Sequence, residues 1–310
     1  MIMKEEATPD KSLFRHIGEN EAMNQAIVRP SMTYWQDAWR RLKKNKAAMI
    51  SLIIVLVFGF MAVAGPFMTK FTFNTNNLNL TNAFPNGVHW FGTDSLGRDM
   101  WARVWMGARV SLFIGVAAAV IETTIGVIIG GISGYFGGKV DLIIMRFIDV
   151  MIAIPELIFI ILIMVAFGSG ILPLIIAFAI TGWLGMARLV RGQVLQLKEQ
   201  EFVLAARTLG ASAPRLILRH LIPNTLGIII VTLTMAVPGA IFYEAFLSFI
   251  GIGIKPPNAS WGQLAQAGSA AFEVYPYLLI IPALFISLTM LSLNILGDGL
   301  RDALDPKLRK

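Results

Sequence analysis

The 310-residue sequence contains no cysteine, and this absence removes several kinds of chemistry. Disulfide bonds, thiolate metal sites and a cysteine nucleophile are all excluded. The three histidines, His16, His89 and His220, are far apart and form no metal-ligand motif. Neither an H-E-x-x-H zinc motif nor a G-x-S-x-G nucleophile motif occurs. We therefore expect no catalytic residue, no metal and no cofactor.

Charged residues are also scarce, since they make up 15% of the chain, against roughly 25% in soluble domains. Hydrophobic residues make up 56%, and they are concentrated in long runs. The net charge of +7 does not indicate a nucleic-acid partner, because the basic residues flank the apolar runs. Membrane topology and anionic lipid account for basic residues in such positions. The composition predicts a membrane protein whose surface contacts lipid.

The apolar runs predict an all-α polytopic membrane protein. A transmembrane helix needs about 20 predominantly apolar residues. Six runs meet this requirement, at 47–67, 110–133, 142–167, 171–190, 225–250 and 276–297. Pro155 and Pro238 fall inside two of these runs and predict kinks. Gly126 and Gly130 form a small-xxx-small pattern that allows close packing between helices.

The distribution of Lys and Arg predicts the orientation of the chain. With the N-terminus inside, the outer segments hold only Lys70, Arg98, Arg103, Arg109 and Lys255, and the inner segments hold the other flanking charges. Positive residues are enriched in cytoplasmic segments, so both termini are expected in the cytoplasm. Residues 1–46 then form a cytoplasmic tail, in which 31–46 is either a basic interfacial helix or a simple polybasic flank. The expected first span is 47–67, followed by an extracytoplasmic loop at 68–109, a five-helix core at 110–297 and a cytoplasmic tail at 298–310.

No phosphate-binding loop is present. Such a loop has the pattern G-x-x-x-x-G-K-[ST]. The nearest stretch, SGYFGGKV at 133–140, begins with Ser133 and ends with Val140. If ATP drives this protein, another chain must hydrolyse it.

Four carboxylates lie in or near the apolar runs: Glu122, Asp149, Glu156 and Glu244. Ionisable groups at membrane depth face a polar interior or a partner, because their desolvation is costly. Glu122, Glu156 and Glu244 are candidates for lining a translocation path or carrying protons, but interhelical hydrogen bonding explains them as well. Asp149 has a possible partner in Arg146, three residues earlier.

The segment EFVLAARTLGASAPRLILRHLIPN, residues 201–224, belongs to an expected cytoplasmic loop at 191–224. Phe202, Ala205, Ala206 and Leu209 have the spacing of one helical face. Gly210 is expected to end this helix, and Ser212 with Pro214 to begin a second one. Pro223 and Asn224 are expected to break the chain before the fifth span. An apolar surface with small alanines suits either a groove on another protein or the lipid surface.

The same segment resembles the cytoplasmic "EAA" loop of ABC importer permeases. The resemblance rests on Ala205, Ala206, Gly210, Ile222 and Pro223, with Leu204 where the family often has Glu. The blocks GTD…GRD, PP…SWG and GDGLRDALDP narrow the resemblance to the C-type subunit of the dipeptide/oligopeptide permease subfamily, over residues 35–310.

This resemblance implies a type I importer in a prokaryotic cytoplasmic (inner) membrane. Its expected partners are a second homologous permease subunit, two cytoplasmic ATP-binding subunits and an extracytoplasmic substrate-binding protein that delivers peptide. It also implies that helix 201–209 couples to an ATPase, and the candidate coupling residues are Glu201, Ala205, Ala206, Arg207 and Gly210. The alternatives are a permease for nickel or another small solute and, from a different class, a proton-coupled secondary transporter. An intramembrane enzyme is disfavoured by the missing catalytic motifs.

Overall fold

The long apolar runs form the long helices of the computed structural model, which describes residues 33–305. The α-helices are α2 (Tyr34–Lys44), α3 (Lys46–Ala64), α4 (Met100–Phe136), α5 (Gly138–Ile152), α6 (Glu156–Phe167), α7 (Ile171–Thr181), α8 (Trp183–Leu197), α9 (Glu201–Thr208), α10 (Ala213–Leu216), α11 (Ile222–Phe249), α12 (Trp261–Ser269) and α13 (Tyr277–Leu304). Short helical turns are η2 (Gly65–Phe67), η3 (Leu78–Leu80) and η4 (Ile217–Leu221). Within these residues the only β-type pairing is one bridge between Thr93 and Asp99. The all-α prediction is confirmed.

Five helices are long and apolar enough to cross a membrane, and a bent helix pair makes the number up to six. The five cover Lys46–Phe67, Met100–Phe136, Ile171–Leu197, Ala213–Phe249 and Tyr277–Leu304. Several extend well past the predicted runs. The helix predicted from residue 110 begins at Met100, because Asp99 caps it by accepting a hydrogen bond of 2.8 Å from the Ala102 amide. Arg103 and Arg109, which we had counted in a loop, therefore lie in a helix.

The predicted span at 142–167 is broken. Its two parts, α5 and α6, meet at an angle of 81° across residues 153–155. Pro155 explains the break, because it has no amide hydrogen and disfavours helical backbone at Ile154. Pro238, in contrast, lies inside the continuous helix α11. The same residue type thus breaks one apolar run and leaves the other continuous.

The chain break predicted at Pro223 and Asn224 is wrong. Pro223 lies in the first turn of α11, directly after the π-helical turn η4. A proline is tolerated in a first turn because the amide there has no helical acceptor. In the same turn, the Asn224 side-chain amide donates a hydrogen bond of 2.5 Å to the backbone carbonyl oxygen of His220. Residues 213–249 therefore continue as one helical stretch.

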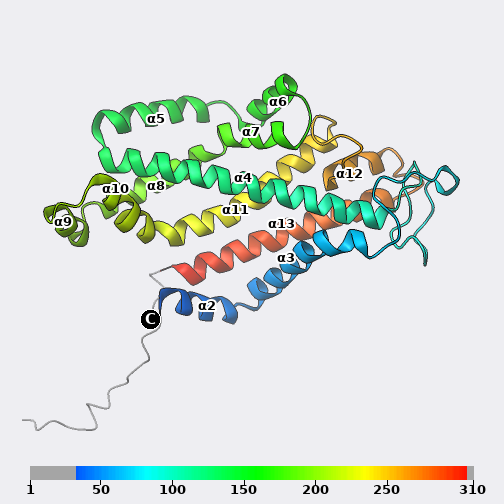
Figure 1. Cartoon of the computed structure of the whole chain (residues 1–310), viewed down its shortest axis with the longest axis horizontal. Helices are drawn as coiled ribbons and strands as arrows, with labels where there is room; N and C mark the ends of the chain where they lie inside the picture. The colour runs from blue at the N-terminus through cyan, green and yellow to red at the C-terminus, as the bar shows by residue number, and fades with distance from the viewer. Residues whose placement is uncertain (1–32, 306–310) are drawn as a thin grey trace, which may run out of the picture. The chain divides into compact units, whose positions relative to one another are not determined.

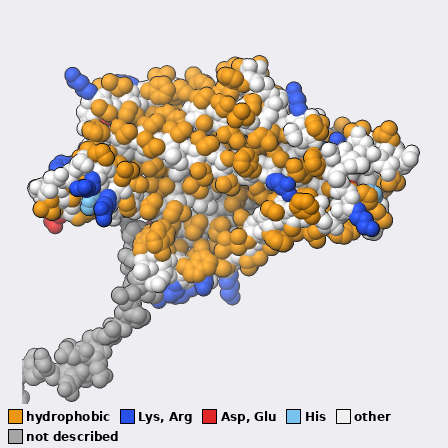
Figure 2. All heavy atoms as spheres, viewed as in Figure 1, with side chains coloured by type: hydrophobic (Ala, Val, Ile, Leu, Met, Phe, Trp, Pro, Cys, Tyr) orange, Lys and Arg blue, Asp and Glu red, His pale blue; other side chains and the backbone are white. Residues whose placement is uncertain are grey.

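From Ala38 onwards the chain forms one unit, in which α4 packs against α8 and α11. The predicted close packing at Gly126 and Gly130 is confirmed, since a side chain at Gly130 would come within 2.4 Å of the Ala187 carbonyl oxygen. Figure 1 shows α9 and α10 at one end of the long helices, and α12 with residues 68–99 at the other. Hydrophobic side chains cover most of the face seen in Figure 2.

Candidate functional site

Helix α9 forms at the predicted place, but its residues divide between two faces. Phe202 and Leu209 are exposed, with 44% and 88% of their surface accessible. Ala205 is exposed as well, so one side of the helix offers an apolar surface. Ala206 is half-buried, and Val203 is fully buried. The predicted face of four residues is thus split, since Ala206 turns towards the chain's own core.

The other candidate coupling residues lie at the start of α9, in its last turn and just after its end. Glu201 opens α9 and is exposed, and Arg207 is exposed with its guanidinium 6.0 Å from the centre of the Tyr135 ring. Gly210 has a φ of +83°, a left-handed conformation that glycine adopts without strain. It ends the helix as predicted, and Ser212 precedes α10 as predicted.

Val203 attaches α9 to the long helices. It belongs to a buried cluster with Met186, Val190 and Val194 of α8 and with Ile229 of α11. Packed side chains in such a cluster move together, because protein interiors have few voids. This cluster therefore links α9 directly to α8 and α11.

A second attachment, which sequence reasoning missed, joins α8 to the end of α4 and the first turn of α5. The Arg191 guanidinium donates to both carboxylate oxygens of Asp141 at 2.5 Å. Ser133 also donates to Asp141 at 2.5 Å, and Lys198 donates to the Gly134 carbonyl oxygen at 3.1 Å. The bidentate arrangement fixes the geometry of the pair. Asp141 and Arg191 are fifty residues apart, so no local spacing indicated their contact.

Asp149 pairs with a different residue from the one predicted. Its carboxylate forms an ion pair with Arg188 of α8, not with Arg146 of its own helix. The spacing of three residues made Arg146 available, but packing of α5 on α8 brings Arg188 closer. Both partners are about half exposed, so this pair differs from the more buried pair of Asp141 and Arg191.

Glu122 and Glu156 approach the same junction between α7 and α8. The Glu122 carboxyl group lies against Gly182, where an added Cβ atom would be 2.1 Å from Cδ of Glu122. The neighbouring Thr181 hydroxyl lies 3.4 Å from Oε1 of Glu156. The two carboxylates come from distant sequence positions, and the fold brings them together.

Glu244 has a separate set of partners. It is fully buried in α11 and accepts hydrogen bonds from Ser111 of α4 at 2.7 Å and from Ser248 at 2.9 Å. The Ser111 hydroxyl also accepts from the Trp261 amide at 3.3 Å, which ties α12 to the same point. Glu244 therefore joins three helices, as the hydrogen-bonding interpretation expected.

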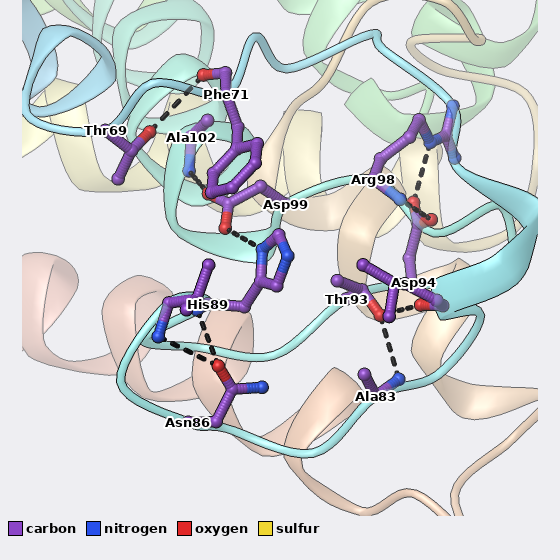
Figure 3. A network of polar contacts seen from close by, with 12 residues as sticks. Thr69, Phe71, Ala83, Asn86, His89, Thr93, Asp94, Arg98, Asp99 and Ala102 are labelled. Carbon is purple, nitrogen blue, oxygen red and sulfur yellow. Dashed lines mark hydrogen bonds and ion pairs between the residues drawn. The ribbon is translucent and has the colours of Figure 1, made fainter.

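Residues 68–99, which we call the Asn-rich segment, are held by a network of buried charges at the other end of the helices (Figure 3). The His89 ring lies 2.8 Å from Asp99, whose other carboxylate oxygen caps α4. Asp94 accepts from the Arg98 side chain at 2.7 Å, and Nε of Arg103 lies 3.3 Å from the same oxygen. Asp94, Arg98 and Asp99 belong to the GTD…GRD block, so the block specifies the structure of this segment.

Arg103 and Tyr277 connect the Asn-rich segment to α12 and α13. Arg103 donates to the Gln263 side chain of α12 and to the Phe73 carbonyl oxygen, both at 3.1 Å. Tyr277 at the start of α13 donates to the carbonyl oxygens of Ala83 and Thr93 at 3.0 Å. The sequence did not indicate which of these residues meet.

Comparisons with known proteins agree with this architecture. The family model described as binding-protein-dependent transport system inner membrane component matches residues 126–310. A second model, the N-terminal transmembrane domain of oligopeptide transport permease C, matches residues 33–85. Together the two models cover α2, α3, the end of α4 and everything from α5 onwards, and they leave residues 86–125 between them.

Individual relatives are similar over almost their whole length. The oligopeptide transport system permease protein OppC of Bacillus subtilis is 51% identical over 300 residues, 97% of this chain and 98% of the relative. The dipeptide transport system permease protein DppC of the same organism is 54% identical over 286 residues, 92% and 89% of the two chains. The glutathione transport system permease protein GsiD of Escherichia coli is 42% identical over 289 residues, 91% and 94%. The chain is a multi-pass membrane permease subunit, and it belongs to the family of binding-protein-dependent transport system inner membrane components.

Proposed function

We propose that this permease carries peptides through the membrane in an ATP-driven importer. The named cargoes of its relatives are oligopeptides, dipeptides and glutathione, which are all peptides. The chain lacks a phosphate-binding loop, so ATP hydrolysis belongs to partner subunits. Two ATP-binding subunits, a second permease and an extracytoplasmic binding protein complete the assembly.

The observation that carries the coupling role is the exposed apolar side of α9. Phe202, Ala205 and Leu209 face outwards, and Val203 fixes the opposite side to α8 and α11. A short helix with small and apolar exposed residues fits a groove on a partner protein. Glu201, Ala205, Arg207 and Gly210 then contact the ATPase, while Ala206 keeps the helix seated on the permease.

The coupling role also implies how the chain is oriented across the membrane. The α9 end of the helices lies in the cytoplasm with both termini, and the Asn-rich segment with α12 lies outside. ATP binding moves α9, and the permease alternates between inward-facing and outward-facing states. The nucleotide shifts this equilibrium only through different contacts in the two states.

A substitution at Ala205 tests the coupling role. In Ala205→Glu, a charged side chain projects from an exposed position, so the permease still folds. We expect co-purification of the ATP-binding subunits to weaken at least about tenfold, a loss of about 1.4 kcal/mol. ATP-dependent peptide uptake into proteoliposomes should fall with it.

Ala270→Glu is the matched control, because Ala270 is exposed at the opposite end of the unit. This variant should retain the ATP-binding subunits. Unchanged co-purification and uptake in Ala205→Glu would contradict the coupling role. Uptake of labelled nickel instead of peptide by the complete importer would favour the small-solute alternative.

A further inference from the structure

A cavity of about 290 Å³ lies between α4, the α7–α8 junction and α11. Its polar lining comes from Glu122 and Thr123 of α4 and from Thr232 of α11. The exposed Gly185 also lines it, so the cavity opens to the surface of the chain. A single water needs roughly 10–15 Å³ of comparable volume, so the cavity has room for a group much larger than one water.

The cavity lies near the middle of three membrane helices. Glu122 is near the centre of the predicted span 110–133, and Gly182 is near the centre of the helical stretch Ile171–Leu197. Thr232 is similarly placed in Ala213–Phe249. Glu122 is an ionisable group at this depth, which is costly in hydrocarbon, and such groups usually mark a substrate or ion pathway.

Glu122, the carboxylate that lines this cavity, and the nearby Glu156 have no positively charged partner within the described part of the chain. Glu122 lines the cavity against Gly182, and Glu156 lies beside the adjacent Thr181. Neither forms an ion pair with Lys, Arg or His among residues 33–305. The hydrogen-bond partner of Glu156 is the neutral hydroxyl group of Thr181. Two acidic groups are thus held close together without a compensating cation.

Thr123 gives an independent indication of a ligand. It is only 7% exposed, lines the same cavity, and its hydroxyl group has no hydrogen-bond partner in the described structure. Buried hydroxyl groups in native proteins are normally hydrogen-bonded. An occupant that offers N–H donors would satisfy Thr123 and Glu122 together.

We propose that this cavity is a subsite for a primary ammonium group of the transported peptide, an inference that rests on the proposed peptide import. An ammonium group has three N–H donors and one positive charge. Glu122 and Glu156 supply the opposite charge, and the Thr123 hydroxyl supplies a neutral acceptor. No group of three or more metal-ligating side chains occurs in residues 33–305, which favours an organic cation over a metal ion. The ammonium group belongs either to the peptide's N-terminus or to a lysine side chain.

Gly182 is part of this subsite because it gives Glu122 its position. The contact of 2.1 Å expected for an added Cβ atom means that Gly182→Ala must displace the Glu122 carboxyl group. This variant keeps both negative charges but moves one of them. It therefore separates the position of the carboxylate from the charge itself.

The test uses the complete importer in proteoliposomes and four peptides that its binding protein loads. The peptides combine a free or acetylated N-terminus with lysine or norleucine at one internal position. The uptake rate of Glu122→Gln is divided by the wild-type rate for the same peptide, so that the preference of the binding protein cancels. Glu273→Gln is the matched control, because Glu273 is exposed and does not line the cavity.

We expect Glu122→Gln to slow the uptake of peptides that carry the recognised ammonium group by about tenfold or more, since hydrogen bonds to charged groups are the strong ones. Peptides without that group should stay within about twofold, and Gly182→Ala should give the same pattern. A loss that disappears on acetylation assigns the N-terminal ammonium, and a loss that disappears with norleucine assigns the lysine ammonium.

An equal loss for all four peptides, or no loss, would overturn the subsite and leave a packing or proton-carrying role for Glu122. The variants must first retain the ATP-binding subunits and ATP hydrolysis, which shows that they fold. If the wild-type importer takes up none of the four peptides, the proposed function itself fails, a result that differs from both other outcomes.

Discussion

One end of the main unit exposes apolar side chains, whereas the other end buries charged ones. At one end, α9 leaves Phe202 and Leu209 exposed and fixes itself through the buried Val203. At the other, Asp94 of the Asn-rich segment is buried and pairs with Arg98 and with the buried Arg103 of α4. The comparison indicates that α9 keeps its surface for a partner, whereas the Asn-rich segment is a preformed structure. Substitutions on the exposed side of α9 should therefore weaken partner binding, and substitutions in the Asn-rich segment should reduce stability.

The largest effect on stability is expected at the Asn-rich segment. Asp94→Ala leaves the Arg98 and Arg103 guanidinium groups buried without their carboxylate, and breaking a buried pair in this way costs about 3–5 kcal/mol. The midpoint of thermal unfolding of the purified chain in detergent should fall clearly. Asp302→Ala removes an exposed carboxylate and should change stability by less than about 0.5 kcal/mol. Equal midpoints for the two variants would show that the network does not stabilise this end.

A smaller effect is expected where α9 meets the long helices. Val203→Ala removes buried methyl groups from the cluster with α8 and should cost about 1–3 kcal/mol of local stability. Leu209→Ala lies on the exposed side and should change stability by less than about 0.5 kcal/mol, while weakening the association of the ATP-binding subunits. Thermal unfolding and co-purification measure the two effects separately. If Leu209→Ala destabilises the chain as much as Val203→Ala, the division of α9 into two faces is incorrect.

The smallest effects concern the ion pairs between α8 and its neighbours. Asp141→Asn removes a bidentate pair that is only partly exposed, and the expected loss is about 1 kcal/mol. Asp149→Asn is the matched control, because its pair with Arg188 is about half exposed and should contribute only a few tenths of a kcal/mol. Amide hydrogen exchange near the end of α8 should accelerate in the first variant and not in the second. The reverse order would contradict the role of Asp141 as the attachment point.

Sequence periodicity and composition predicted the helices well, because long apolar runs have few alternative structures. The division of α9 into Val203 and Ala206 on one side and Ala205 on the other could not be predicted, since it depends on which neighbours α9 meets. The broken span at Pro155 and the continuous helix at Pro223 show the same limit, because the effect of a proline depends on its place in the hydrogen-bond ladder.

The long-range polar contacts could not be predicted from the sequence either. Asp141 and Arg191, or Glu122 and Gly182, are far apart in the chain, and no local pattern relates them. Motif resemblance marked Asp94, Arg98 and Asp99 as a block, and the structure supplies the reason, namely the buried network in which they take part. The sequence showed which residue types the block contains, but only the fold shows which of these residues contact one another.

Amide hydrogen exchange over residues 201–211, measured in the permease with and without its ATP-binding subunits, tests the central claim most directly. If α9 is the attachment site, exchange in this segment slows when the ATP-binding subunits are present, while exchange in residues 78–99 is unchanged. Identical exchange of residues 201–211 in both samples, with the ATP-binding subunits shown to be bound, would contradict the account.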